Sequence, residues 1–421
     1  MMLKKQLLAG VLAISAGFAG QVSAQTELTM WYHGAGNPAE SAILATVVEE
    51  FNASQTDYSV EIVKFPQISY NDSVAAAALA GKLPDIIDVD GPIMPNWAWA
   101  GYLAPLDIPA ETYAKFLPGP IGMWDGKVYS VGLWDAAVAI VTRKSVLDEH
   151  GIRIPTLDAP WTFEEFDGAL TKIQAGGKFE YALDMGMAWK GEWYPYAFSP
   201  FLQSFGGDLV DRTTYKTAEG ALNGDAAMKF GTWWQSLFTR KLVPGTTQDP
   251  ADRDTGFLDG KYAMSWNGVW AVLKLVEKYG DDLLFLPAPD FGNGSKIGAA
   301  SWQFAVSATS ANKEGANAFI KFALGDKHLI AFSDGMGLIP PTPEAAAASV
   351  NYKAGGPMEA FYELSARQAL LRPVTPGYPV EAKIFEKVLT DIADGADVAA
   401  TLDTAADEIT ADIEKNKGYG H

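Results

Sequence analysis

LTMWY at residues 28–32 opens the stretch that decides the fold, and DIIDV at residues 85–89 closes it. Both runs are short and apolar, as in buried strands, and apolar residues at intervals of four after the first run indicate a helix. A second strand and a second helix are expected between them, at 58–65 and 73–80. Strands that alternate with helices in this way favour an α/β lobe with a largely parallel sheet.

A second group of elements follows residues 107–126, which are rich in Pro and Gly and are expected to form irregular surface. Thr162 and Glu165 have the T-x-x-E spacing of a capping box, so a helix is expected to begin there. Two apolar stripes beyond residue 383 indicate helices at the end of the chain. Further strands are expected at 127–132, 137–142, 181–185, 283–286 and 301–307, and further helices at 194–205, 225–238, 312–324 and 326–333.

The composition is that of an acidic globular protein without thiol chemistry. Of the 421 residues, 48% are apolar and 20% are charged, which supports a packed core in two or three domains. The net charge of −19 disfavours binding to nucleic acid or to an anionic membrane surface. The chain has no Cys, which excludes disulfides and zinc–thiolate sites, and its 4 His show no ligand spacing, so we expect no metal and no cofactor.

Residues 1–24 have the three parts of a secretory signal peptide. A basic pair stands at 4–5, an apolar run at 7–18 and the small-x-small sequence VSA at 22–24. The apolar run is shorter than the roughly 20 residues that span a bilayer. We predict cleavage after Ala24 and, because no Cys follows that a lipid could modify, a free protein in a bacterial periplasm; full secretion is the alternative.

The end of the first strand carries two features that allow more than one interpretation. Residues 34–39 satisfy G-x-G-x-x-A, the spacing of a dinucleotide-binding loop, but Lys64 and Phe65 stand where an acidic residue for the ribose is expected. A turn that leads into a helix beside a ligand cleft is the preferred interpretation. His33 precedes this turn, at the strand end where open α/β sheets bind ligands, although most lone His residues are structural.

Carboxylates and aromatic residues suggest a ligand rich in hydroxyl groups. Asp88 and Asp90 suit either glycoside hydrolysis or hydrogen bonding to sugar hydroxyls without chemistry. The chain has 13 Trp, 16 Tyr and 21 Phe, most of which must belong to the core. An indole beside polar residues can cover the apolar face of a sugar ring while charged side chains bond its rim. Trp residues of this kind, where a strand meets a loop, are Trp31, Trp134, Trp189, Trp266 and Trp302.

A series of motifs follows in a set order along the chain. They are LTMWYH (28–33), LPDIIDVD (83–90), GYLAPL (101–106), YSVG with WD (129–135), WTFEEF (161–166), GKYAM with WNG (260–268), SW (301–302) and RPV (372–374). In this order the chain resembles the extracellular solute-binding proteins of bacterial ABC importers for carbohydrates, the family 1 group with maltose- and trehalose-binding members. The resemblance covers nearly the whole chain after residue 24.

The resemblance implies a two-lobed α/β periplasmic binding protein fold that closes on its ligand about a hinge. The implied lobes comprise 25–134 with 302–334, and 135–301 with 335–421. Asp90 is then expected at the end of the third strand and Asp135 at the first crossing between the lobes. Trp266 and Trp302 would be stacking plates, and Arg372 would bond hydroxyls or an anionic substituent. Weaker implied ligand-binding residues are His33, Glu40, Gln67 and Trp189.

We therefore expect a monomeric periplasmic binding component of an ABC importer, without catalytic residues. It would take a small-molecule carbohydrate or glycoside in the interlobe cleft and deliver it to permease subunits in the inner membrane. Two alternatives stay open: a secreted glycoside hydrolase that uses Asp90 and Asp135, and a binding protein for a non-sugar solute such as a polyamine.

Overall fold

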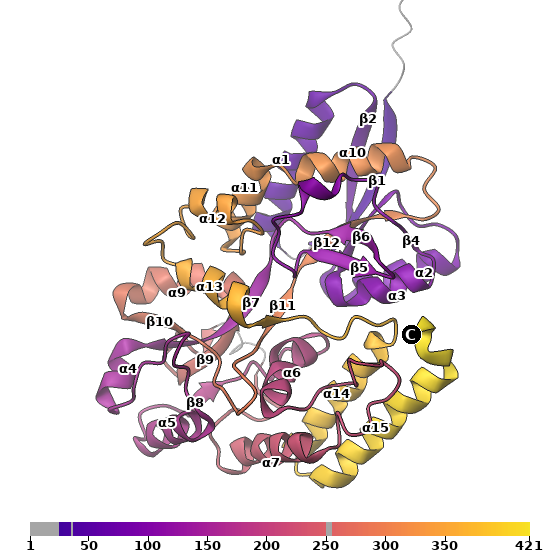
Figure 1. Ribbon diagram of the computed structural model, residues 1–421. Coiled ribbons are helices and arrows are strands. Elements are labelled where there is room, and N and C mark those ends of the chain that lie inside the picture. Colours follow the sequence, from indigo (N-terminus) through magenta and orange to yellow (C-terminus); the bar gives the residue numbers. More distant parts are fainter. Residues whose placement is uncertain (1–24, 35–36, 250–254) are drawn as a thin grey trace, which may run out of the picture.

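The first of two sheets is built around the strands nearest the N-terminus (Figure 1). The computed structural model describes residues 25–34, 37–249 and 255–421, so the predicted cleavage after Ala24 and two residues of the G-x-G-x-x-A turn lie outside the described residues. The strand order is β2-β1-β3-β12-β6-β5, with β4 paired to β12. The strands are β1 (Thr26–Tyr32), β2 (Tyr58–Lys64), β3 (Ile86–Asp90), β4 (Leu103–Ala104), β5 (Ile121–Trp124), β6 (Lys127–Val131) and β12 (Trp302–Ser307).

Only part of this sheet is parallel. The β1 strand pairs in parallel with β2 and β3, but β12 is antiparallel to both β3 and β6, and β5 is antiparallel to β6. The expectation of a largely parallel sheet is therefore wrong. The reason is that β5 and β6 form a hairpin, and β12 enters from the other lobe in the opposite direction.

The helices of the first lobe are α1 (Pro38–Ser54), α2 (Gln67–Leu79), α3 (Met94–Trp99), α10 (Lys313–Ala323) and α11 (Asp326–Met336). The first begins where the sequence dictates, because Asn37 accepts a hydrogen bond from the Glu40 N–H and Pro38 stands in the first turn. The α2 helix begins directly after Pro66, six residues before the expected start at Ser73. Val47 and Phe51, four residues apart on α1, are buried as expected, and Ile43, one interval earlier, is half-buried and packs against the core.

The second sheet has the order β13-β11-β7-β9-β8, with β10 also paired to β7. Its central strand begins with six apolar residues and is buried along nearly its whole length, as a strand covered on both faces requires. The strands are β7 (Ala136–Arg143), β8 (Tyr181–Asp184), β9 (Tyr262–Gly268), β10 (Leu283–Leu286), β11 (Ile297–Ala300) and β13 (Ala369–Leu370). The pairs β8–β9 and β11–β13 are parallel, whereas β7 is antiparallel to each of its partners.

Helices surround the second sheet, and two long ones lie side by side near the C-terminus (Figure 1). The helices around the second sheet are α4 (Lys144–Glu149), α5 (Phe163–Ala175), α6 (Trp193–Phe205), α7 (Asp225–Thr239), α9 (Val272–Tyr279), α13 (Glu359–Gln368), α14 (Tyr378–Ala393) and α15 (Val398–Lys415), whereas α12 (Pro343–Ala348) packs against α11 of the first lobe. The predicted capping box at Thr162 and Glu165 is confirmed with both of its hydrogen bonds. Single 3-10 turns cover Gly91–Ile93, Ala110–Thr112, Val269–Ala271, Gly280–Asp282 and Lys417–Gly420.

The chain passes from one sheet to the other between β6 and β7, between β11 and β12, and again after α11. The main chains of Asp135 and Ile339 tie the first and third crossings together through two hydrogen bonds of 2.8 and 3.0 Å. The proposed lobe boundaries at 134/135 and 301/302 fall at these crossings, and the one at 334/335 falls within the last turn of α11. None of the helices in the described parts of the chain combines the length and apolar character that crossing a membrane requires.

Candidate functional site

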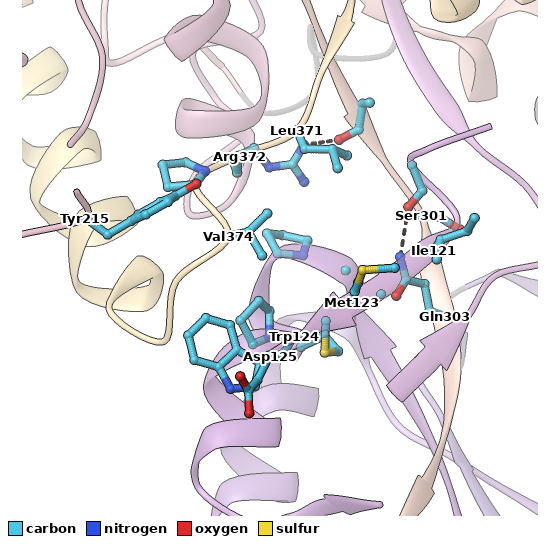
Figure 2. Close-up of a pocket in the computed structure, with 18 of the residues that line it drawn as sticks. Ile121, Met123, Trp124, Asp125, Tyr215, Ser301, Gln303, Leu371, Arg372 and Val374 are labelled. Atoms are coloured by element: carbon cyan, nitrogen blue, oxygen red, sulfur yellow. Dashed lines mark hydrogen bonds between the residues drawn. The ribbon is translucent and has the colours of Figure 1, made fainter. Parts of the chain in front are cut away.

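A cavity of about 440 Å³ is lined by residues of both lobes (Figure 2). Its volume is within the range of small-molecule sites. In Figure 2, Arg372 and Val374 approach it from one side and Met123 and Trp124 from the other. The first lobe and the adjoining crossing supply Gly91, Pro92, Met94, Pro95, Gly119, Ile121, Gly122, Met123, Trp124, Asp125, Gly126, Ser301 and Gln303. The second lobe supplies Tyr215, Ala299, Leu371, Arg372, Pro373, Val374 and His421.

Arg372 brings a buried guanidinium group to this cavity. It stands in the extended segment after β13, and only 4% of the residue is exposed. Its Nε donates to Glu192 Oε1 at 3.0 Å, and one Nη1 proton is donated to the Ala299 carbonyl. The guanidinium carbon lies 4.9 Å from the ring centre of Tyr196. The other three N–H groups have no hydrogen-bond acceptor among the described residues, so they can serve a ligand.

Glu192 fixes the orientation of Arg372. Glu192 directly precedes α6, and its Oε1 also accepts a hydrogen bond of 2.5 Å from the hydroxyl of Tyr378, the first residue of α14. Burial raises the pKa of the Glu192 carboxyl above its ordinary value, although the charge of Arg372 acts in the opposite direction. A charge-assisted hydrogen bond made by a buried guanidinium group holds that group more strictly than a solvent-exposed ion pair does. Arg372 is thus positioned before a ligand arrives.

Asp90 is the counterpart of Arg372 in the first lobe. It ends β3, its main chain pairs with Trp302, and the next residue, Gly91, lines the cavity. Only 8% of Asp90 is exposed, and within the described residues no donor is hydrogen-bonded to its carboxylate. Burial raises the pKa of Asp90 to about 6, while the charges of Arg372 and His33 oppose the rise. The electrostatic interaction with Arg372 connects the two lobes.

His33 belongs to a buried network inside the first lobe. Its Nδ1 is hydrogen-bonded to Asp88, and its ring stacks on Trp302 with a centroid distance of 3.7 Å and an interplanar angle of 10°. Its Nε2 lies 3.6 Å from Oε1 of Glu40, which also accepts a hydrogen bond from Tyr32. Burial by itself lowers the pKa of His33, but the Asp88 carboxylate outweighs it, and the pKa is raised. None of these side chains lines the cavity.

The two remaining predicted Trp residues are committed to packing in the second lobe. Trp266 is 1% exposed, and its indole N–H donates to the Ala197 carbonyl at 3.0 Å. Because its ring is enclosed in the core, it has no free face for a sugar, and we leave it out of the site proposed below. Trp189 is half-buried in a cluster with Trp193 and Trp270, at centroid distances of 4.8 and 5.6 Å.

The other two predicted residues lie at the surface and in a crossing. Gln67 is exposed at the start of α2. Asp135 is 1% exposed, and its carboxylate accepts hydrogen bonds from Ser365 Oγ at 3.1 Å and from the Ala136 N–H at 2.8 Å. These contacts hold the crossing between β6 and β7. Of the predicted residues, only Arg372 lines the cavity itself, with Asp90 and Trp302 next to lining residues.

Sequence reasoning missed the partners of Arg372 and the aromatic side chains of the cavity. Glu192 is 180 residues and Tyr378 is six residues from Arg372 in sequence, and no local pattern marks either one. Trp124 and Tyr215 line the cavity but lie outside all the sequence motifs quoted above. Within the described residues, no group of three or more His, Asp or Glu is arranged to hold a metal ion.

Residues 417–421 reach from the second lobe to the first beside the cavity. The ring of Tyr419 meets Trp99 edge to face at 5.2 Å, and the ring of His421 meets Trp124 at 5.1 Å. His421 also stacks on Tyr215 at 4.6 Å. Together these rings form an aromatic bridge, defined here as Trp99, Trp124, Tyr215, Tyr419 and His421. The bridge joins the lobes at the more exposed end of the cavity.

Known proteins share this architecture over most of its length. A family model described as bacterial extracellular solute-binding protein matches residues 46–360. An uncharacterized lipoprotein in the oleD 5′ region of Streptomyces antibioticus is 26% identical over 351 residues, which are 80% of this chain and 76% of the relative. The diacetylchitobiose binding protein DasA of Streptomyces coelicolor is 24% identical over 343 residues, which are 77% and 74% of the two chains. The structure of a cyclic α-maltosyl-1,6-maltose binding protein from Arthrobacter globiformis superposes with a TM-score of 0.77 at 22% identity, covering 93% of this chain and all of that one.

Proposed function

Because this chain belongs to the bacterial extracellular solute-binding protein family, we propose that it is the substrate-binding component of an ABC importer and binds a sugar or glycoside between its lobes. It would act in the periplasm, as a monomer, and pass the ligand unchanged to permease subunits in the inner membrane. Relatives named for sugar binding support the class of ligand.

The observation that carries the proposal is a pair of buried, oppositely charged side chains from the two lobes, close enough that the charge of Arg372 opposes the rise in the pKa of Asp90. Arg372 comes from the second lobe and Asp90 from the first. Within the described residues, three N–H groups of Arg372 have no acceptor and the Asp90 carboxylate has no donor. A sugar hydroxyl is both a donor and an acceptor, so one ligand can bond to both. Contacts from both lobes stabilise the closed arrangement, and the differential affinity for that arrangement drives closure.

The glycoside hydrolase alternative has less support in the geometry. It needs two carboxyl groups that flank a bond of the ligand. The Asp135 carboxylate is bonded to Ser365 and to the main chain in the crossing, so it is not free to act on a ligand. We therefore propose binding without chemical change.

A thermal-shift screen of the mature protein against sugars and glycosides tests the function, because a ligand that binds only the native form raises the melting temperature. We expect at least one sugar or glycoside to raise it in a concentration-dependent way and to be recovered intact after incubation. Release of a cleaved product would overturn binding in favour of hydrolysis. A response to polyamines with none to any sugar or glycoside would overturn the ligand class.

A further inference from the structure

The walls of the interlobe cavity are more apolar than an unmodified sugar requires. Met94, Ile121, Met123, Leu371, Pro373 and Val374 all line it. They come from α3, β5 and the segment after β13, so both lobes contribute apolar surface. Met side chains are flexible and polarizable, and they adapt to irregular apolar groups.

The polar residues at the buried end of the cavity are already used by the protein. Gln303 is 2% exposed, and its amide donates to the Gly119 carbonyl at 2.8 Å and accepts from Ser130 at 2.5 Å. The Ser301 hydroxyl donates to the Trp302 carbonyl at 2.7 Å. Among the polar lining groups there, the guanidinium group of Arg372 retains free donors.

The combination of an apolar wall and a single group with free donors favours one of two kinds of ligand. A sugar with hydroxyls on every side leaves several of them without partners against Met, Ile, Leu and Pro, and buried hydroxyls without hydrogen bonds are unfavourable. A ligand with one apolar portion instead removes that surface from water, which is favourable in proportion to its area. Arg372 can still bond an oxygen of the attached sugar.

We propose that the ligand is an amphiphilic glycoside, a sugar that carries an alkyl or aryl group, with that group packed between Ile121 and Leu371. The inference rests on the proposed function, since it assigns a chemical class to the same interlobe site. The sugar oxygens face Arg372 and Asp90, and the apolar group occupies the wall that offers no hydrogen bonds.

Calorimetric titration with matched ligands tests the assignment. The probes are glucose, galactose, N-acetylglucosamine and maltose, each beside its p-nitrophenyl glycoside, with p-nitrophenol alone as a third arm. We expect at least one aryl glycoside to bind ten times or more tightly than its free sugar, with a more negative heat-capacity change and with p-nitrophenol much weaker. Free sugars that bind as tightly as their aryl glycosides would overturn this inference and leave the proposed function standing. p-Nitrophenol binding as tightly as the glycosides, or no binding by any probe, would overturn both.

Two variants test whether the apolar group of the ligand packs against Ile121 and Leu371. Ile121→Thr keeps a β-branched strand residue but replaces the ethyl group by a hydroxyl, and Leu371→Ser changes a residue outside helices and strands. Either variant is expected to weaken binding of the aryl glycoside at least threefold more than binding of its free sugar. Val63→Thr, at an exposed β2 position far from the lining residues, is the matched control. A full preference in folded Ile121→Thr and Leu371→Ser proteins would overturn the placement.

Discussion

Among the described residues, each lobe has a nearly fully buried cationic side chain that is hydrogen-bonded to a carboxylate, and the two pairs are built differently. In the first lobe, the His33 imidazole is hydrogen-bonded to Asp88, stacked on Trp302 and close to Glu40. Its two nitrogens and one face of its ring therefore contact other side chains of the same lobe. In the second lobe, Arg372 uses two of its five N–H groups on Glu192 and Ala299 and turns the others toward the cavity. The first pair makes its contacts within the fold, whereas the second retains N–H donors that can bind a ligand.

The comparison shows why burial of a charged group does not by itself identify a ligand site. Both pairs are nine-tenths buried or more on the cationic side, yet only one of them lines a cavity. The number of unused donors separates the two cases, because a buried group with all its hydrogen bonds made has nothing left for a ligand. The predictions below test this distinction.

The largest effect is expected on removal of the imidazole of the first pair. His33→Ala leaves Asp88 buried without its cation, which should lower the free energy of unfolding by about 4 kcal/mol. Urea denaturation measures this loss, and ligand affinity at a temperature where the variant is folded should stay within about threefold. His328→Ala, which breaks a contact with the partly exposed Glu50, should cost less. A tenfold loss of affinity in folded His33→Ala would make His33 a ligand contact after all.

A buried carboxyl without any hydrogen bond provides a second test. Glu381 in α14 is 1% exposed, and neither of its oxygens has a partner among the described residues. Burial raises its pKa to about 8, above the ordinary value, so the folded state keeps a proton that the unfolded state releases between pH 4.5 and 8. Stability should therefore fall as pH rises across that window, by about 3.5 kcal/mol between pH 5 and 8.

Glu381→Gln should flatten this pH dependence, and urea unfolding at several pH values measures it. Glu408→Gln, an exposed change in α15, is the control and should leave the slope as it is. An unchanged slope in Glu381→Gln would show that Glu381 is ionised in the folded protein at neutral pH.

Removal of the second pair's cation should affect binding. Arg372→Ala takes away the donors that face the cavity, and ligand affinity should fall at least tenfold, about 1.4 kcal/mol. Calorimetry on the folded variant measures it. Arg240→Ala removes an exposed pair with Asp167 and should leave affinity unchanged. Retention of full affinity by folded Arg372→Ala would remove Arg372 from the site.

The smallest effect is expected at the aromatic bridge. Tyr419→Ala removes an edge-to-face contact with Trp99, and such pairs contribute about 0.5–1.5 kcal/mol. The equilibrium of the ligand-free protein should shift toward separated lobes, and X-ray scattering should record a larger radius of gyration. Tyr181→Ala, whose ring contact with Tyr262 lies within one lobe, is the control. An unchanged radius would mean that the bridge does not hold the lobes together.

The sequence predicts the long elements of this fold better than its site. The apolar residues spaced along α1 and the capping box at Thr162 depend on residues that are close in sequence, so they can be predicted without knowledge of the fold. The short β5 strand escapes prediction because it exists only by pairing with β6. Trp266 has the same local surroundings as a stacking plate, but a carbonyl 69 residues away takes its N–H group. Glu192 and Arg372 meet only in three dimensions, so no pattern joins them.

The aromatic bridge should also make the intrinsic tryptophan fluorescence of the protein sensitive to the separation of its lobes. Two indoles of the first lobe, Trp99 and Trp124, rest against rings of the second. Separation of the lobes would expose them to water and change their fluorescence, so opening and closing can be followed in the unlabelled protein.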